Sequence, residues 1–404
     1  MWQAPQLSKE VQYLLVVVGL FIIARALQRY RIPSAVTCVA LGALAGMGFG
    51  LFHDDGAVPL LATLGIVSLF LFAGLDVDFS DLRRGFRVTV GHLLLQVVLL
   101  AAVARLVSTV FELEWRSAVL FALAILTPST GFILDSLAGF GLSEQQQFWV
   151  KTKAIASELV ALGALFVVVQ SASASSLALS TLALGAMILG LPVVFQVFAS
   201  RVLPHAPKSE FAFLLILALV CAFATRQLGV YYLVGAFVVG VTAVRLRERL
   251  PALASERLTI GIELFASFFI PFYFFKAGLH LQEEYFAWQA VLLGLGFVLV
   301  VVPLRVAIVA GFRRLVLGEP WRDGVRVGMS LVPTLVFTLV LADILRERYA
   351  LPPQLFGALV VFALVNTALP GLVLRTPPPD FVEPEIRRSQ PPPKLVVTSS
   401  AGPS

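Results

Sequence analysis

Long apolar stretches recur along nearly the whole of this 404-residue chain, from residue 11 to residue 375. Each stretch is about 17–28 residues long, which is the length that an α-helix needs to cross the hydrocarbon core of a bilayer. Lipid offers the backbone no hydrogen bonds, so every stretch has to satisfy its own peptide groups by forming a helix. The sequence therefore predicts an all-α polytopic membrane protein.

Thirteen transmembrane helices are expected from these stretches. The composition agrees, because 13% of the residues are charged, whereas a typical soluble domain has about 25%. We expect the spans at residues 11–28, 34–51, 59–75, 87–111, 115–139, 144–171, 176–202, 210–227, 229–246, 257–282, 285–314, 325–346 and 353–375.

Basic residues are concentrated in every second loop between the expected spans, for example at residues 83–87 and 245–249. The opposite loops carry acidic residues, such as residues 54–55 and 283–284. This positive-inside bias predicts a multi-pass protein of the inner (plasma) membrane, with its N-terminus outside and its C-terminus in the cytoplasm. Nucleic-acid binding is not expected, because the basic residues do not gather on one soluble face.

Two pairs of similar segments lie at nearly the same spacing in the sequence. Residues 70–75 resemble residues 274–279, and residues 128–132 resemble residues 333–337. The members of each pair lie seven positions apart in the order of the spans, an odd number, so the two copies should run in opposite directions through the membrane, as in many secondary transporters. The expected transmembrane domain, 1–375, thus has two inverted six-helix repeats, 11–171 and 210–375, a linker helix, 176–202, and a disordered cytoplasmic tail, 376–404.

Each repeat has a proline inside a span, Pro128 in the first and Pro333 in the second. A proline removes one helix hydrogen bond and clashes with the preceding turn. Either proline alone could be an ordinary kink, but two at matching positions favour crossed broken helices at a binding site. Neighbouring hydroxyls could satisfy the freed backbone or face an ion: Thr127, Ser129, Thr130 and Thr334.

Ionisable side chains inside a span are costly and indicate function. Glu158, preceded by Ser157, lies near the middle of the sixth span, and Arg305 lies in the eleventh. Burial disfavours a charged carboxylate and a nearby cation favours it, so a proton and a metal cation can compete for Glu158. We expect Arg305, Lys276 and Lys153 to compensate charge.

Structural explanations exist for the same charges. Glu158 and Arg305 could form a buried ion pair, Lys276 could extend towards the membrane surface, and Lys153 could be interfacial.

The sequence has no catalytic triad, phosphate-binding loop or metal motif, so we expect no enzymatic activity, no catalytic residue, no cofactor and no metal beyond a transported cation.

Several of these segments resemble the monovalent cation:proton antiporters, especially the Kef-type sodium/hydrogen exchanger branch, over nearly the whole membrane part: residues 31–34, 65–67, 72–78, 235–240 and 273–279. In that family the helix matching the sixth span carries an ion-binding aspartate after a polar residue, which corresponds here to Ser157-Glu158, and the basic residue of a later helix corresponds to Arg305. The resemblance implies a homodimer in the lipid bilayer that exchanges Na⁺ or K⁺ for H⁺ by elevator-type alternating access.

The chain departs from the family pattern at several positions. Glutamate replaces the aspartate, Ser157 stands where relatives have Asp or Asn, and Lys153 stands where some relatives have a glutamate. A Gly-Glu-Phe stretch and a cytoplasmic nucleotide-binding domain are absent. Two alternatives follow from the residues: a passive ion channel or membrane sensor on the same fold, or a small organic anion symporter that uses Arg305 and Lys276 as a clamp.

Overall fold

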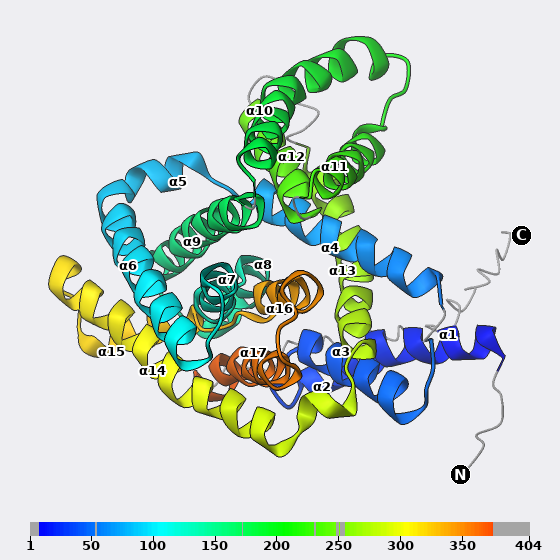
Figure 1. The fold of residues 1–404 in the computed structure, drawn as a ribbon. Helices are drawn as coiled ribbons and strands as arrows, with labels where there is room; N and C mark the ends of the chain where they lie inside the picture. The colour runs from blue at the N-terminus through cyan, green and yellow to red at the C-terminus, as the bar shows by residue number, and fades with distance from the viewer. Residues whose placement is uncertain are drawn as a thin grey trace, which may run out of the picture.

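The computed structural model describes residues 8–52, 55–171, 173–229, 232–247, 250 and 255–374 (Figure 1). Within these ranges the regular structure is entirely helical. The helices are α1 (Lys9–Val18), α2 (Ala24–Gln28), α3 (Ser34–Ala43), α4 (Ala57–Leu75), α5 (Phe79–Arg84), α6 (Phe86–Val110), α7 (Trp115–Leu126), α8 (Thr130–Ser136), α9 (Glu144–Gln170), α10 (Ala174–Val197), α11 (Glu210–Gln227), α12 (Tyr232–Leu246), α13 (Glu256–Leu279), α14 (Trp288–Leu317), α15 (Trp321–Ser330), α16 (Leu335–Tyr349) and α17 (Pro353–Val373). Short π or 3₁₀ turns are Gly19–Ile23, Leu44–Gly48, Leu137–Phe140, Phe198–Val202 and Glu283–Phe286.

Ten helical segments of the described chain are long and apolar enough to cross a membrane. The pair α15 and α16, bent by 50° at its break, would be an eleventh, and two shorter apolar helices lie at Ser34–Gly48 and Tyr232–Leu246. These places coincide with the thirteen expected spans, so the all-α polytopic fold is confirmed, while the number thirteen stays a prediction. The tail expected at 376–404 lies outside the described residues.

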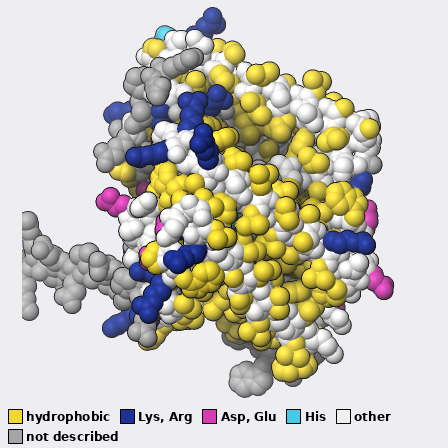
Figure 2. Space-filling view, turned by 90° about the vertical axis from the view of Figure 1, so that its left-hand side faces the viewer, with side chains coloured by type: hydrophobic (Ala, Val, Ile, Leu, Met, Phe, Trp, Pro, Cys, Tyr) yellow, Lys and Arg dark blue, Asp and Glu magenta, His cyan; other side chains and the backbone are white. Residues whose placement is uncertain are grey.

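Large apolar side chains cover the outer surface of the helices. Leu182 and Leu189 on α10 are 73% and 77% exposed, and Leu299 on α14 is 75% exposed. Figure 2 shows one face of the molecule, most of which is hydrophobic, with charged side chains mainly towards its margins. Such a surface suits lipid, because a soluble protein rarely exposes so large a continuous apolar area.

Two groups of helices make up the fold. In the first, which we call the α4 group, α4 packs along α12 and α13, α3 along α13, and α11 and α10 along α12. In the second, the crossing group, α7 packs on α6, α9 and α16, and α14 packs on α15 and α17. The groups meet where α4 contacts α8, α9 contacts α10 and α17 contacts α3. Three of the four half-helices, α7, α8 and α16, lie in the middle of the crossing group, and α15 lies at its edge beside α14 (Figure 1).

Paired glycines let the helices of the α4 group approach closely. A Cβ atom on Gly74 of α4 would lie 2.4 Å from the carbonyl oxygen of Phe237 and 3.1 Å from the Cα of Gly240 on α12. A Cβ atom on Gly278 of α13 would lie 3.0 Å from the Cα of Gly42 on α3. Each of these two contacts therefore joins a glycine of one predicted repeat to a glycine of the other, as small residues at membrane helix interfaces allow.

Candidate functional site

Both prolines lie in breaks between helices, as predicted. The first break separates α7 from α8 and has extended backbone at Thr127 and Ser129, on either side of Pro128. The second break separates α15 from α16 and contains Pro333. The amide of Ser129 donates a hydrogen bond of 2.8 Å to the carbonyl oxygen of Pro333. The two breaks therefore meet directly, and the predicted crossing of broken helices is present.

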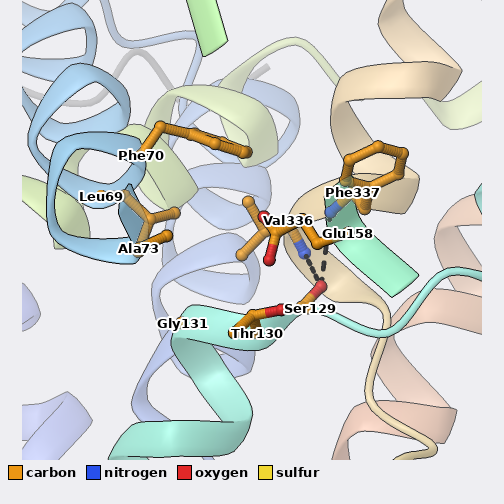
Figure 3. Close-up of a pocket in the computed structure, with 9 residues that line it drawn as sticks. All are labelled: Leu69, Phe70, Ala73, Ser129, Thr130, Gly131, Glu158, Val336 and Phe337. Atoms are coloured by element: carbon orange, nitrogen blue, oxygen red, sulfur yellow. Dashed lines mark hydrogen bonds between the residues drawn. The ribbon is translucent and has the colours of Figure 1, made fainter. Parts of the chain in front are cut away.

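The hydroxyl of Ser129 caps the opposite half-helix. Its Oγ accepts hydrogen bonds from the amides of Val336 at 3.1 Å and Phe337 at 3.4 Å (Figure 3). These amides belong to the first turn of α16, where helix N–H groups lack partners within the helix. A second link runs from the Thr338 hydroxyl to the carbonyl oxygen of Ala124, at 2.7 Å. Each arm of the crossing thus satisfies backbone groups of the other.

The guanidinium of Arg305 binds the carbonyl ends of both broken helices. It donates to Leu331 at 2.7 Å and Val332 at 2.9 Å, which follow α15, and to Ile125 at 3.4 Å, near the end of α7. The last carbonyls of a helix are unpaired and carry partial negative charge, so a buried arginine is well placed to satisfy them.

Arg305 does not form the ion pair with Glu158 that the sequence allowed. The ion pairs in the described part of the chain are Arg313–Glu319 and Arg346–Asp343. The physical reason is that carbonyl groups of the two breaks occupy the guanidinium. The two side chains line separate cavities on different sides of the crossing.

Glu158 is 4% exposed and faces a cavity of about 10 Å³, roughly the volume that holds one water molecule. Figure 3 shows that the lining comes from α4, the first break with the start of α8, α9 and α16. Glu158 is the one titratable side chain in this lining, which consists of Leu69, Phe70, Ala73, Ser129, Thr130, Gly131, Glu158, Val336 and Phe337.

Thr130 is the polar neighbour of the Glu158 carboxylate. The amide and the hydroxyl of Thr130 lie beside it, yet that hydroxyl, like the buried hydroxyl of Thr127, has no hydrogen bond of good geometry to any described residue. A hard cation prefers carboxylate, hydroxyl and carbonyl oxygens as ligands. A carboxylate beside a free buried hydroxyl is therefore suited to hold one dehydrated cation.

Ser157 lies apart from Glu158, although the two are neighbours in sequence. Successive residues of an α-helix point about 100° apart, and the Ser157 hydroxyl turns away to donate to the Oε1 of Gln96 at 2.7 Å. It lines a second cavity together with Lys153, Arg305 and Pro128. The predicted Ser157–Glu158 ligand pair is therefore not assembled at one site.

Lys276 and Thr334 line neither cavity. Lys276 belongs to the last turn of α13 and acts electrostatically on Asp343 of α16. The Thr334 hydroxyl accepts a hydrogen bond of 2.8 Å from the Nδ2 of Asn366 on α17. Among the predicted ion ligands, Glu158, Ser129 and Thr130 are those brought together.

Two amide side chains were missed by the sequence interpretation. Asn366 is fully buried, with 0% exposure, and supports the second break, and Gln96 on α6 holds Ser157. The sequence does contain a signal for both residues, which is a polar amide inside an apolar span. Such an amide needs hydrogen-bond partners, as a charged side chain does.

Comparisons with known proteins agree with this geometry. A family model described as "Sodium/hydrogen exchanger, transmembrane" matches residues 14–377. The chain is 22% identical over 372 residues to a probable Na⁺/H⁺ antiporter 3 of Methanocaldococcus jannaschii, covering 88% of this chain and 93% of that protein. It is 20% identical over 366 residues to a Na⁺/H⁺ antiporter of Enterococcus hirae, covering 86% and 92%.

A solved structure shares the fold. The sodium proton antiporter MjNhaP1 from Methanocaldococcus jannaschii superposes with a TM-score of 0.65 at 14% sequence identity, covering 91% of this chain and 95% of that one. At this identity the likeness concerns the arrangement of the helices. It shows that the broken helices belong to an antiporter-type fold.

Proposed function

Because the chain belongs to the transmembrane sodium/hydrogen exchanger family, and its relatives are transporters rather than enzymes, we propose that it exchanges a monovalent cation for protons across the membrane. The names of its relatives favour Na⁺, and K⁺ is the second candidate. The observation that carries the proposal is the Glu158 carboxylate, buried beside the Thr130 hydroxyl in a cavity between the two helix groups.

In this mechanism a proton and a cation compete for Glu158. The deprotonated carboxylate, with the hydroxyl oxygen of Thr130, binds the cation and replaces part of its hydration shell. Protonation removes the negative charge that holds the cation and leaves a neutral side chain, which costs less to bury than a carboxylate. Because Glu158 is the one carboxylate in the described lining, the exchange is one cation for one proton and electroneutral.

Alternating access would come from movement of the crossing group against the α4 group. Leu69, Phe70 and Ala73 of α4 form one wall of the cavity, and residues of the crossing form the other. Sliding one wall past the other would expose Glu158 first on one side of the membrane and then on the other, as in an elevator. The homodimer, the inverted repeats 11–171 and 210–375, and the N-outside orientation remain predictions of the same proposal.

The proposal is tested with purified protein in liposomes that contain a pH-sensitive dye. Addition of Na⁺ should collapse an imposed pH gradient, and a series of K⁺ and Li⁺ additions identifies the preferred cation. Glu158→Gln should reduce this response to that of protein-free liposomes, because an amide cannot exchange a proton at neutral pH. Glu158→Asp, which keeps a carboxylate, should retain part of it.

Glu144→Gln is the matched control, since Glu144 is an exposed residue in the first turn of the same helix α9; it should leave exchange unchanged. Exchange by Glu158→Gln at the rate of the unmodified protein would reject Glu158 as the site. Loss of the gradient without any added cation would favour a channel. Dependence on an organic anion that disappears in Arg305→Ala would favour a symporter, although Lys276 does not line a cavity with Arg305.

A further inference from the structure

A second cavity lies on the other side of the crossing, and cation exchange at Glu158 does not use it. It has a volume of about 40 Å³ and is enclosed by α6, α9, α14 and the ends of α7 and α15. Its lining consists of His92, Gln96, Leu99, Leu126, Pro128, Lys153, Ser157, Arg305, Ile308, Val309, Gly328 and Leu331.

Among the residues that the structure describes, two cations line this cavity and no carboxylate does. The side chains of Lys153 and Arg305 repel one another electrostatically. Arg313, a third cation whose charge acts on Lys153, has its own counterion, since Glu319 binds it with two contacts of 2.7 Å. The hydrogen bonds of Arg305 go to carbonyl groups, which carry no net charge. The charge on the cavity wall is therefore uncompensated by any described residue.

Lys153 has neither a hydrogen bond nor an ion pair to any residue that the structure describes. The Lys153 side chain is half-buried, and an ammonium group that loses part of its hydration without gaining a partner is unfavourable. Lysine can lose its proton to relieve that cost, whereas arginine cannot. A bound anion is the other way to relieve it, and it would compensate both side chains at once.

The remaining polar groups of the wall can donate hydrogen bonds. The Oε1 of Gln96 accepts from the Ser157 hydroxyl, and the NH₂ group of the same amide can only donate. His92 is buried in the same wall and its ring carries an N–H donor. A lining of two cations and further donors, with no carboxylate, is complementary to an anion.

The volume selects the size of the anion. One water needs about 10–15 Å³ measured in this way, so a cavity of about 40 Å³ has room for a single small ion and a water. A sugar phosphate, a nucleotide or a lipid headgroup would not fit. We propose that this cavity binds one small inorganic anion, with chloride as its natural size, between Lys153 and Arg305.

Equilibrium binding of radiolabelled chloride to the purified full-length protein tests the proposal. Sodium and ionic strength are held constant by replacing chloride with gluconate, which is too large for the cavity. We expect saturable binding of about one chloride per chain. Lys153→Gln should weaken it about tenfold or more, because it removes one charge-assisted hydrogen bond, whereas Lys153→Arg should retain binding.

Lys151→Gln is the matched control, because Lys151 lies on the same helix but does not line the cavity; its binding should equal that of the unmodified protein. Gln96→Leu removes a hydrogen-bond donor without changing the charge and should weaken chloride binding by a smaller factor. It is the test variant if Lys153→Gln does not fold. Glu158→Gln should still bind chloride, so this test stands even if the exchange proposal fails. Absence of saturable chloride binding would overturn the inference. So would a chloride affinity in Lys153→Gln and Gln96→Leu that equals the affinity of the unmodified protein.

Discussion

Ser129 performs two tasks at the centre of the molecule. Its amide donates to Pro333, and its hydroxyl accepts from the first amides of α16. It also lines the Glu158 cavity. One small side chain therefore closes the crossing and shapes the wall of the proposed cation site, and a change at this position affects both stability and exchange.

Ser129→Ala should lower the free energy of unfolding by about 1 kcal/mol, which is the typical loss when a helix cap is removed. Thermal unfolding in detergent, followed by tryptophan fluorescence, measures the effect. Ser267→Ala is the control, because Ser267 is exposed and its hydroxyl donates only to Leu264 of its own helix. If both variants unfold at the same temperature as the unmodified protein, the Ser129 hydroxyl does not support α16.

Glycine contacts define how the elements of the α4 group fit together. A Cβ atom on Gly42 would lie 2.0 Å from the carbonyl oxygen of Phe275, and one on Gly65 would lie 2.3 Å from that of Phe269. Backbone cannot move aside as a flexible side chain can, so α13 must sit this close to α3 and α4. We therefore expect the α4 group to be the rigid frame in the proposed alternating access.

Gly42→Ala should destabilise the protein by about 1–3 kcal/mol, because the added methyl group overpacks a backbone contact. Gly163→Ala is the control. Gly163 lies in α9, and a Cβ atom added to it would have no neighbour within 4 Å. Alanine at this position should therefore be neutral or should stabilise the helix by up to about 1 kcal/mol. The unfolding temperatures of the two variants are measured in the same detergent, and only that of Gly42→Ala should fall below that of the unmodified protein. Equal shifts would contradict the close approach of α3 and α13.

The sequence predicts these elements well where a local rule applies. Apolar length located the spans, and Pro128 and Pro333 located both breaks, because each effect acts within one helix. The partners of Arg305 were not predictable in this way, since the carbonyls that it binds lie 26, 27 and 180 positions away. The separation of Ser157 from Glu158 was predictable from helix geometry, but the sequence interpretation counted both among the oxygen ligands of a cation, and the family resemblance also made them a pair.

At the scale of the whole molecule, the distribution of charge predicts the orientation. Basic loops such as the one around Arg84 are expected in the cytoplasm, and the acidic turn around Glu284 outside. Both residues are exposed, and the two native cysteines, Cys38 and Cys221, are 1% and 6% exposed. The native thiols should therefore react slowly and leave introduced cysteines as clear reporters.

Glu284→Cys should react with a membrane-impermeant maleimide on intact cells, and Arg84→Cys should react only after the membrane is opened. The unmodified protein, labelled in parallel, gives the background from the buried thiols. The reverse pattern would place the N-terminus in the cytoplasm and would contradict the predicted orientation.

The bonds between the two breaks also have a consequence for how the protein is made. Ser129 and Val336, joined by a hydrogen bond, are 207 positions apart, so the ribosome completes the first arm of the crossing long before the second. During that interval the extended backbone around Pro128 has no partner, and lipid cannot provide one. Newly made α7 and α8 must therefore wait in a hydrated or protein-lined setting at the insertion machinery until α15 and α16 arrive.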